Sequence, residues 1–126
     1  MKIEAKGDSL LVVNDKRDTI RLAIDLYSIL ALKQEYKLRP REEDFFIGCV
    51  LAFHEGLDLG TQRFINYMLN NYKFTKDVRQ IYNFRSIMIK KKWFRPTGDS
   101  FDIPELFKGK INTLSVNVLI KSQDLN

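Results

Sequence analysis

Polar side chains of the kinds that read nucleic-acid bases recur at helical spacing between residues 76 and 92. Four share one face of a helix at i, i+4, i+7 and i+11, and two lie at its edge: Arg79, Asn83, Ser86 and Lys90, with Lys76 and Gln80. Arginine pairs with guanine, and Asn or Gln pairs with adenine, because their donors and acceptors match those base edges. The stretch therefore predicts a contact with nucleic acid. The competing interpretation is an ordinary solvated face, since any soluble helix needs a polar side.

Positive charge is concentrated beside this stripe. The chain carries a net charge of +5; residues 1–75 hold 11 basic and 11 acidic side chains, whereas residues 76–126 hold 10 and 5. Lys90, Lys91, Lys92 and Arg95 cluster where the predicted helix gives way to the next segment. Such clusters suit the phosphate backbone. The three lysines equally suit the negative end of a helix dipole, and both explanations can hold together.

Catalytic and metal-binding motifs are absent from the sequence. One cysteine, Cys49, and one histidine, His54, allow neither an intramolecular disulfide nor a zinc site of Cys and His in one chain. The acidic trio 42–44 suits a helix N-terminus better than a metal site. No P-loop, Rossmann glycine pattern or nucleophile elbow occurs. We therefore expect no enzymatic activity and no cofactor, with Cys49 buried in the core and His54 a structural or surface residue.

Length and composition predict one α+β domain, mainly helical, over residues 1–126. A chain of 126 residues with 44% apolar and 12% aromatic residues can bury a core. The N-terminus is charged where a signal peptide would be apolar. The longest apolar run, Phe45 to Phe53, has nine residues, and a membrane span needs about 20. We expect a cytoplasmic protein without a membrane partner.

Four helices are expected, at about 18–36, 40–55, 61–72 and 75–92, forming a three- to four-helix core. Asp18 and Thr75 are the expected N-caps of the first and last. Val78, Ile81, Tyr82, Met88 and Ile89 form the expected inward face of the last helix. The first helix is apolar over most of its circumference, which implies burial from more than one side or contact with a partner chain.

Two hairpins are expected around these helices. One has strands at 3–5 and 10–13 with a turn at 7–8, and residues 114–120 alternate in polarity as a half-buried strand does. The terminal strands, about 3–13 and 111–121, are therefore predicted to form one small sheet. The other hairpin has strands at 93–95 and 101–103. Its Trp93 and Phe94 are expected to fill the core rather than stack on bases.

Residues 40–104 resemble a winged helix-turn-helix domain. The recognition-like helix is Thr75-Lys-Asp-Val-Arg-Gln-Ile-Tyr-Asn-Phe-Arg-Ser, its exit and first wing strand are Lys90-Lys-Lys-Trp-Phe-Arg, and Pro96 to Ile103 supply the wing tip and return strand. The resemblance implies that Arg79, Asn83 and Lys90 read bases and that Arg95 is a wing contact.

The sequence departs from the winged-helix pattern in three respects. No short strand is evident between the early helices, the wing is short, and the bulky Phe84 and Ile87 flank the polar stripe. Winged helices also dock proteins, so the fold alone would leave the function open.

The leading expectation is a non-enzymatic protein that binds DNA or another polyanion in regulation, replication or genome packaging. The alternative is a structural or assembly protein, such as a virion component, working as a homo-oligomer or within a larger complex. The apolar first helix and the terminal strands favour that alternative. Abundant Lys, Asn, Ile and Phe suit an AT-rich genome, so we expect a source such as a phage, and a place in the host cytoplasm or the virion.

Overall fold

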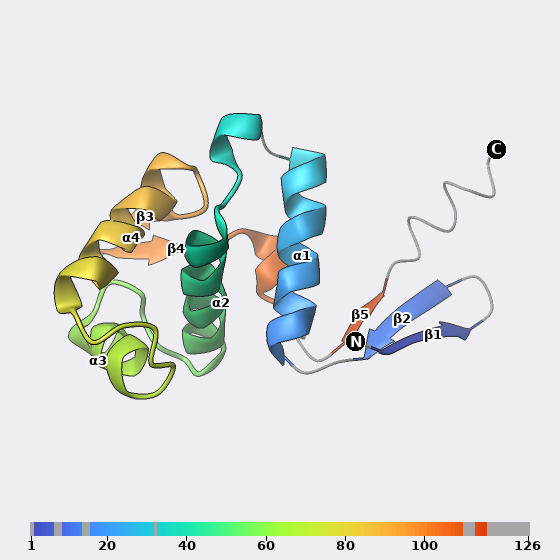
Figure 1. Ribbon diagram of the computed structural model, residues 1–126, viewed down its shortest axis with the longest axis horizontal. Helices are drawn as coiled ribbons and strands as arrows, with labels where there is room; N and C mark the ends of the chain where they lie inside the picture. Colours follow the sequence, from blue (N-terminus) through green and yellow to red (C-terminus); the bar gives the residue numbers. More distant parts are fainter. Residues whose placement is uncertain (1, 7–8, 14–15, 32, 110–112, 116–126) are drawn as a thin grey trace.

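A computed structural model describes residues 2–6, 9–13, 16–31, 33–109 and 113–115. It confirms a mainly helical α+β fold, with two small antiparallel sheets among the described residues (Figure 1). The elements, in chain order, are β1 Lys2–Lys6, β2 Ser9–Val13, α1 Lys16–Ala31, the 3-10 helix η1 Gln34–Tyr36, α2 Pro40–His54, α3 Gln62–Asn70, α4 Val78–Lys90, β3 Arg95–Thr97, β4 Ser100–Asp102, the 3-10 helix η2 Glu105–Phe107 and β5 Thr113–Ser115.

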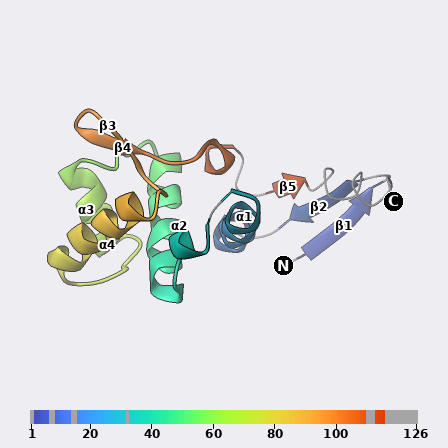
Figure 2. The ribbon, with the colours of Figure 1, turned by 90° about the horizontal axis from the view of Figure 1, so that it is seen from above.

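Helix α2 lies at the centre of the helical core. Helix α1 packs on one side of it, and α3 and α4 pack on the other (Figures 1 and 2). Every residue from Phe45 to Val50 is buried. The helix begins at Pro40, and the Glu42 carboxylate accepts a hydrogen bond from the Arg39 amide at 2.9 Å, satisfying an N–H at the start of the helix. The acidic residues here thus serve the helix N-terminus.

An aromatic cluster joins α1, α2, η2 and the chain after α4. Trp93 is fully buried, and its ring centroid lies 5.0 Å from that of Tyr27, 4.9 Å from that of Phe46 and 6.0 Å from that of Phe107. Its indole nitrogen donates to the carbonyl of Tyr36 at 2.7 Å, which satisfies the buried N–H. The expectation that Trp93 and Phe94 fill the core is confirmed, since Phe94 is 3% exposed.

Two predicted helix boundaries were wrong. The first helix ends at Ala31 rather than near residue 36, and the separate η1 follows. The Tyr36 carbonyl bonds to the Trp93 indole, so this backbone serves a tertiary contact instead of continuing the helix. Helix α4 starts at Val78 because Asp77, and not Thr75, is the N-cap: its carboxylate accepts from the Arg79 amide at 2.9 Å. Similarly, α3 ends at Asn70 instead of 72.

The turn after α4 shifts the second hairpin along the chain. Lys92 has φ of +68°, its amide donates to Ile89, and the Trp93 amide donates to Met88 at 2.8 Å. This is a Schellman motif, which ends a helix with one left-handed residue. The reversal sends Trp93 inward, so the first strand begins at Arg95 rather than 93. Strands β3 and β4 pair antiparallel, with Pro96 opposite Phe101.

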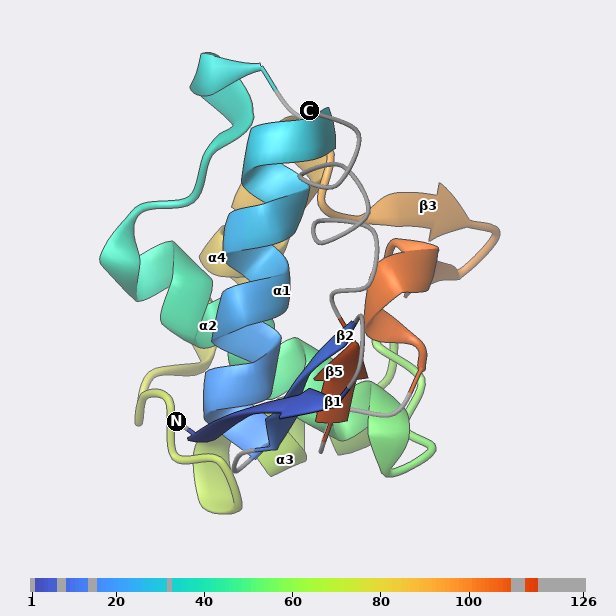
Figure 3. The same ribbon diagram turned by 90° about the vertical axis from the view of Figure 1, so that its right-hand side faces the viewer.

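The predicted sheet between the two ends of the chain is confirmed for the described residues. Strand order is β1-β2-β5, all antiparallel, with Ile3 opposite Val12 and Val12 opposite Leu114. The sheet lies beyond the N-terminal end of α1, on the side away from α2 (Figures 1 and 3). The predicted turn at 7–8 and the remainder of the predicted 111–121 strand fall outside the described residues. Of the helices that the structure describes, none has the length and apolar character to cross a bilayer.

Candidate nucleic-acid interface

Helix α4 is fixed on the core by one face. Ile81 and Met88 are completely buried. Phe84 stacks on Phe45 with ring centroids 5.5 Å apart and meets the Phe74 ring edge-on at 5.1 Å. Residues 81, 84 and 88 therefore define the inward stripe at i, i+3 and i+7. Phe84 thus belongs to the inward stripe rather than beside the polar one.

The rotation set by Phe84 corrects part of the expected inward face. Val78 and Tyr82 were expected to point inward but are 38% and 45% exposed. Ile89 is half-buried against the core. The large aromatic ring has more apolar area to remove from water than Val78 has, so its burial sets the orientation of the helix.

The opposite side of α4 is open to solvent. We call it the α4 outer face, and it comprises five exposed residues: Arg79, Gln80, Asn83, Ser86 and Lys90. Among the residues that the structure describes, the side chains of Asn83, Ser86 and Lys90 make no hydrogen bond or ion pair. The amide oxygen of Gln80 accepts from the Thr75 hydroxyl at 2.8 Å, which leaves its NH2 group as a donor.

Arg79 is the most exposed cation with a printed contact on this face. Its side chain is 88% exposed, and its Nε lies 3.4 Å from a carboxylate oxygen of Asp77. The backbone amide of Arg79 and then its side chain hold the pKa of Asp77 below the usual value. An exposed ion pair of this kind contributes about 0–1 kcal/mol. Arg79 can therefore exchange Asp77 for another anion at little cost.

Three further predicted residues flank the α4 outer face. Lys76 and Lys92 are exposed, and their ammonium groups contact no carboxylate among the described residues. Arg95, at the start of β3, is 76% exposed and donates to Asp102 at 3.0 Å. Lys108 also bonds Asp102, and it is the main reason that the pKa of Asp102 lies below its usual value. Arg95 is thus accessible, although one of its nitrogens is engaged.

Lys91 does not belong to this surface, and its expected phosphate contact is corrected. Its ammonium group bonds the carboxylate of Glu42 and also donates to the carbonyl of Lys37 at 3.1 Å. The side chains of Lys91 and Glu42 are only 20% and 11% exposed. Helix periodicity explains this position, because residue 91 lies at i+7 and i+3 from the inward Phe84 and Met88. Lys91 clamps the end of α4 to the start of α2.

One residue without a predicted role, Arg85, joins α4 to the hairpin. Its guanidinium carbon lies 5.0 Å from the Tyr82 ring centroid and 5.1 Å from that of Phe101 in β4. Its Nη1 donates to the carbonyl of Leu59 at 3.0 Å. Nothing in the sequence distinguished Arg85 from the other cations of the cluster, because its partners come from segments 16 to 26 residues away.

The hairpin is also held from below by the loop between α2 and α3. The Asp58 carboxylate accepts from Ser100, and this bond holds the pKa of Asp58 below its usual value. A Cβ atom at Gly60 would lie 2.5 Å from the carbonyl oxygen of Asp99. The backbone of the loop therefore touches the hairpin tip directly, and only glycine fits there.

The residues considered for other chemistry occupy structural positions. Cys49 is fully buried, and burial raises the pKa of its thiol well above the usual value. Nε2 of His54 donates to the carbonyl of Phe107 at 2.7 Å, which ties the end of α2 to η2. Within residues 16–31 and 33–109, no group of His, Cys, Asp and Glu side chains is arranged to hold a metal ion.

The arrangement is therefore a helix with a buried apolar stripe, a solvated amide- and cation-bearing face, and a basic segment leading into a short hairpin. It offers donors to an anionic partner, and the described residues contain no apparatus for covalent chemistry. No protein-family model, no curated protein and no solved structure matches the chain.

Proposed function

We propose that the protein binds nucleic acid, with the α4 outer face directed into the major groove of duplex DNA. The observation that carries the proposal is the exposure of Arg79, Asn83 and Lys90 on a helix whose opposite side is anchored in the core. Arg and Asn are the residue types that discriminate guanine and adenine through paired hydrogen bonds. A helix held rigidly on a core loses little freedom on binding, which favours base readout.

Lys76, Lys92 and Arg95 supply the phosphate contacts in this proposal, and Gln80 and Ser86 are adaptable polar contacts. The three cations lie before α4, after α4 and on β3, so they bracket the helix as backbone-positioning residues do. The region from residue 73 to 95 has eight basic residues and one acidic residue, which gives this surface a positive field.

The element order supports a winged-helix-like use of this region. Helices α2, α3 and α4 are followed directly by the β3–β4 hairpin, as the resemblance implies. Two features count against a close relationship: residues 33–94 contain no strand, and the link between α3 and α4 is seven residues long. In this proposal the helix reads the groove, and the short hairpin contacts the backbone through Arg95. A role in regulation, replication or genome packaging would use the same surface.

Retardation of duplex DNA at several salt concentrations tests the proposal. Affinity for a mixed-sequence duplex should fall steeply with salt, and Lys90→Ala should lower the slope of log K against log salt by about 1, as expected for one phosphate contact. Lys33→Ala is the matched control, since Lys33 is an exposed lysine preceding η1. Absence of retardation at about 50 mM salt would refute nucleic-acid binding.

Base readout requires a separate measurement on sequences selected from a random duplex pool. At a selected site, Asn83→Ala or Arg79→Ala should cost about 1–3 kcal/mol and relax the preference at one base position. Equal losses on selected and unselected duplexes would restrict α4 to backbone contacts. Comparison with single-stranded and duplex RNA of the same sequence identifies the class of nucleic acid.

A structural role in an assembly is the second candidate, such as a virion component. Ile29 and Leu30, in the last turns of α1, are 72% and 77% exposed. Adjacent exposed apolar side chains of this size are typical of surfaces that meet a partner. A second copy of the chain is the partner we propose. Sedimentation across a concentration series tests it: Ile29→Ser with Leu30→Ser should abolish self-association, whereas a monomer at every concentration would refute it.

A further inference from the structure

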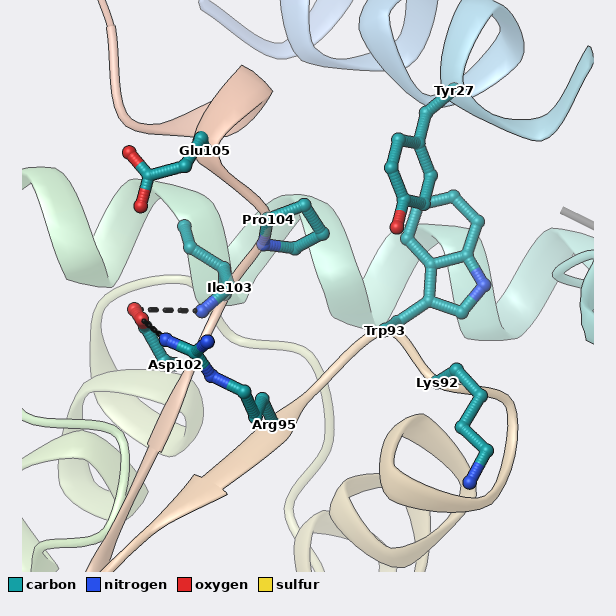
Figure 4. A pocket seen from close by; sticks show the side chains of 8 residues that line it. All are labelled: Tyr27, Lys92, Trp93, Arg95, Asp102, Ile103, Pro104 and Glu105. Carbon is teal, nitrogen blue, oxygen red and sulfur yellow. Dashed lines mark hydrogen bonds and ion pairs between the residues drawn. The ribbon is translucent and has the colours of Figure 1, made fainter. Parts of the chain in front are cut away.

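A small pocket lies between α1 and the base of the hairpin, apart from the α4 outer face. It has a volume of about 200 Å³ and is lined by Tyr27 of α1, by Lys92, Trp93 and Arg95 after α4, and by segment 102–105 (Figure 4). Three parts of the chain far apart in sequence therefore converge here. The buried Trp93 closes the floor, since it is fully inaccessible to solvent.

Two hydrogen-bond donors at this pocket have no partner among the described residues. They are the hydroxyl of Tyr27 and the ammonium group of Lys92. Figure 4 shows the Tyr27 hydroxyl directed from α1 into the pocket, while Lys92 stands at the rim. The Tyr27 ring is fixed by edge contacts with Trp93 and Phe107 at 5.0 and 5.7 Å. The hydroxyl is therefore held in place, whereas the flexible lysine stem can move its charge over the opening.

The two carboxylates that also line the pocket are already matched by cations. Asp102 accepts from Arg95, from Lys108 and from the Ile103 amide, each at 3.0 Å. Glu105 is 85% exposed and pairs with Lys108 at 2.8 Å. Arg95 and Lys108 balance the charges of these two groups, so Lys92 is the unmatched charge at the site. Asp102 also orients the Arg95 guanidinium, whose other nitrogens remain available as donors.

The backbone at Lys92 adds a second reason to assign its side chain a role. With φ of +68°, Lys92 occupies the left-handed position of the helix end, where glycine is the usual residue. A side chain there costs free energy, and such local strain is often retained where the side chain acts. The position directs the lysine to the pocket rim instead of along the helix.

The size and donors of the pocket fit a single oxyanion. Pockets for drug-sized ligands measure about 300–1,000 Å³, so this one is too small for a whole nucleotide. A hydroxyl, an ammonium and a guanidinium fork suit the oxygens of a phosphate group. We propose that this pocket binds one phosphate group through Tyr27, Lys92 and Arg95. The inference does not require that α4 bind nucleic acid, because inorganic phosphate alone tests it.

Trp93 provides the measurement, since it is the single tryptophan of the chain and lines the pocket. Its fluorescence should change saturably with inorganic phosphate at constant ionic strength, with a midpoint on the order of 1–10 mM. Chloride at the same ionic strength should leave the emission unchanged. No saturable response to phosphate in the unaltered protein would overturn the proposal.

Matched variants assign the response to the pocket. Tyr27→Phe keeps the packed ring and should weaken phosphate binding about 3–10-fold, as expected for one lost hydrogen bond; Lys92→Gln should weaken it at least as much. Tyr82→Phe and Lys90→Gln are the controls, because both residues are exposed on α4 and neither lines the pocket. Equal affinities in the pocket variants and the controls would contradict the assignment, and far-ultraviolet circular dichroism checks that each variant is folded.

The source of the phosphate follows from competition. A short oligonucleotide carrying a 5′-phosphate is compared with its 5′-hydroxyl form and with inorganic phosphate, and tighter binding of the first identifies a nucleic-acid terminus. Equal affinity of the 5′-phosphate form and inorganic phosphate identifies the free anion. Asn83→Ala should reduce DNA retardation and leave the phosphate response intact, so failure of one proposal is distinguishable from failure of the other.

Discussion

Replacing Lys92 with glycine should stabilise the protein while removing the phosphate response. The left-handed conformation costs a residue with a side chain about 1–2 kcal/mol, and glycine avoids that cost. Glycine also increases the conformational entropy of the unfolded chain, which costs about 0.4–1 kcal/mol. With φ of +68° at Lys92, the first effect is the larger. We expect a net gain of roughly 0.5–1 kcal/mol in the free energy of unfolding.

Urea unfolding followed by Trp93 fluorescence measures this gain, because the indole is buried in the native state. A gain of this size corresponds to a rise in Tm of about 2–5 °C for a domain of this length. Lys90→Gly is the matched control: it removes the same side chain two residues earlier, within α4, and should destabilise by about 1 kcal/mol. If both glycine variants destabilise the protein alike, the reasoning about the helix end is refuted.

The other predictions concern the contacts that hold α4 and the hairpin. Lys91→Ala should destabilise the protein by about 2 kcal/mol, because Glu42 keeps a largely buried carboxylate without its cation; thermal unfolding measures the loss, and DNA retardation should stay unchanged. Gly60→Ala should cost about 1–3 kcal/mol, since its methyl would lie 2.5 Å from a backbone oxygen, whereas Gly109→Ala meets nothing and should be neutral; equal stabilities would show that the loop yields freely. The pKa of Asp102 is lowered in the folded state, so its stabilising effect is complete above the unfolded value of about 3.9 and is lost as pH falls through the lower folded value. NMR amide exchange in the hairpin between pH 2 and 6 follows that loss, and a hairpin equally protected throughout would contradict it.

The sequence predicted the helical elements well wherever one local signal dominated. The apolar spacing of α2, the Pro40 start and the Thr61 N-cap of α3 are local signals, and the structure follows them, with Thr61 accepting from the Phe64 amide at 3.4 Å. The end of α1 and the start of β3 could not be obtained in this way. Both depend on the contact of the Trp93 indole with the Tyr36 carbonyl, across 57 residues.

The candidate interface divides along the same line. The exposed positions Arg79, Asn83 and Lys90 follow from helical periodicity, so the sequence placed them on one solvated face. Lys91 looked equivalent to Lys90 in the sequence, yet its neighbour Glu42 belongs to another helix, and only the folded chain reveals the ion pair. Tyr27 had no predicted role, because its hydroxyl gains meaning only from the residues that meet it at the pocket.

The central position of α2 has a consequence for the way the protein opens. Because α1, α3 and α4 all pack against α2, none of the three retains its apolar contacts if α2 unfolds. The amides of residues 45 to 50 should therefore exchange with solvent deuterium only through global opening, at the slowest rate in the chain. Strands β1 and β2, which lie to the side of that core, should exchange through a local opening that leaves the four helices intact.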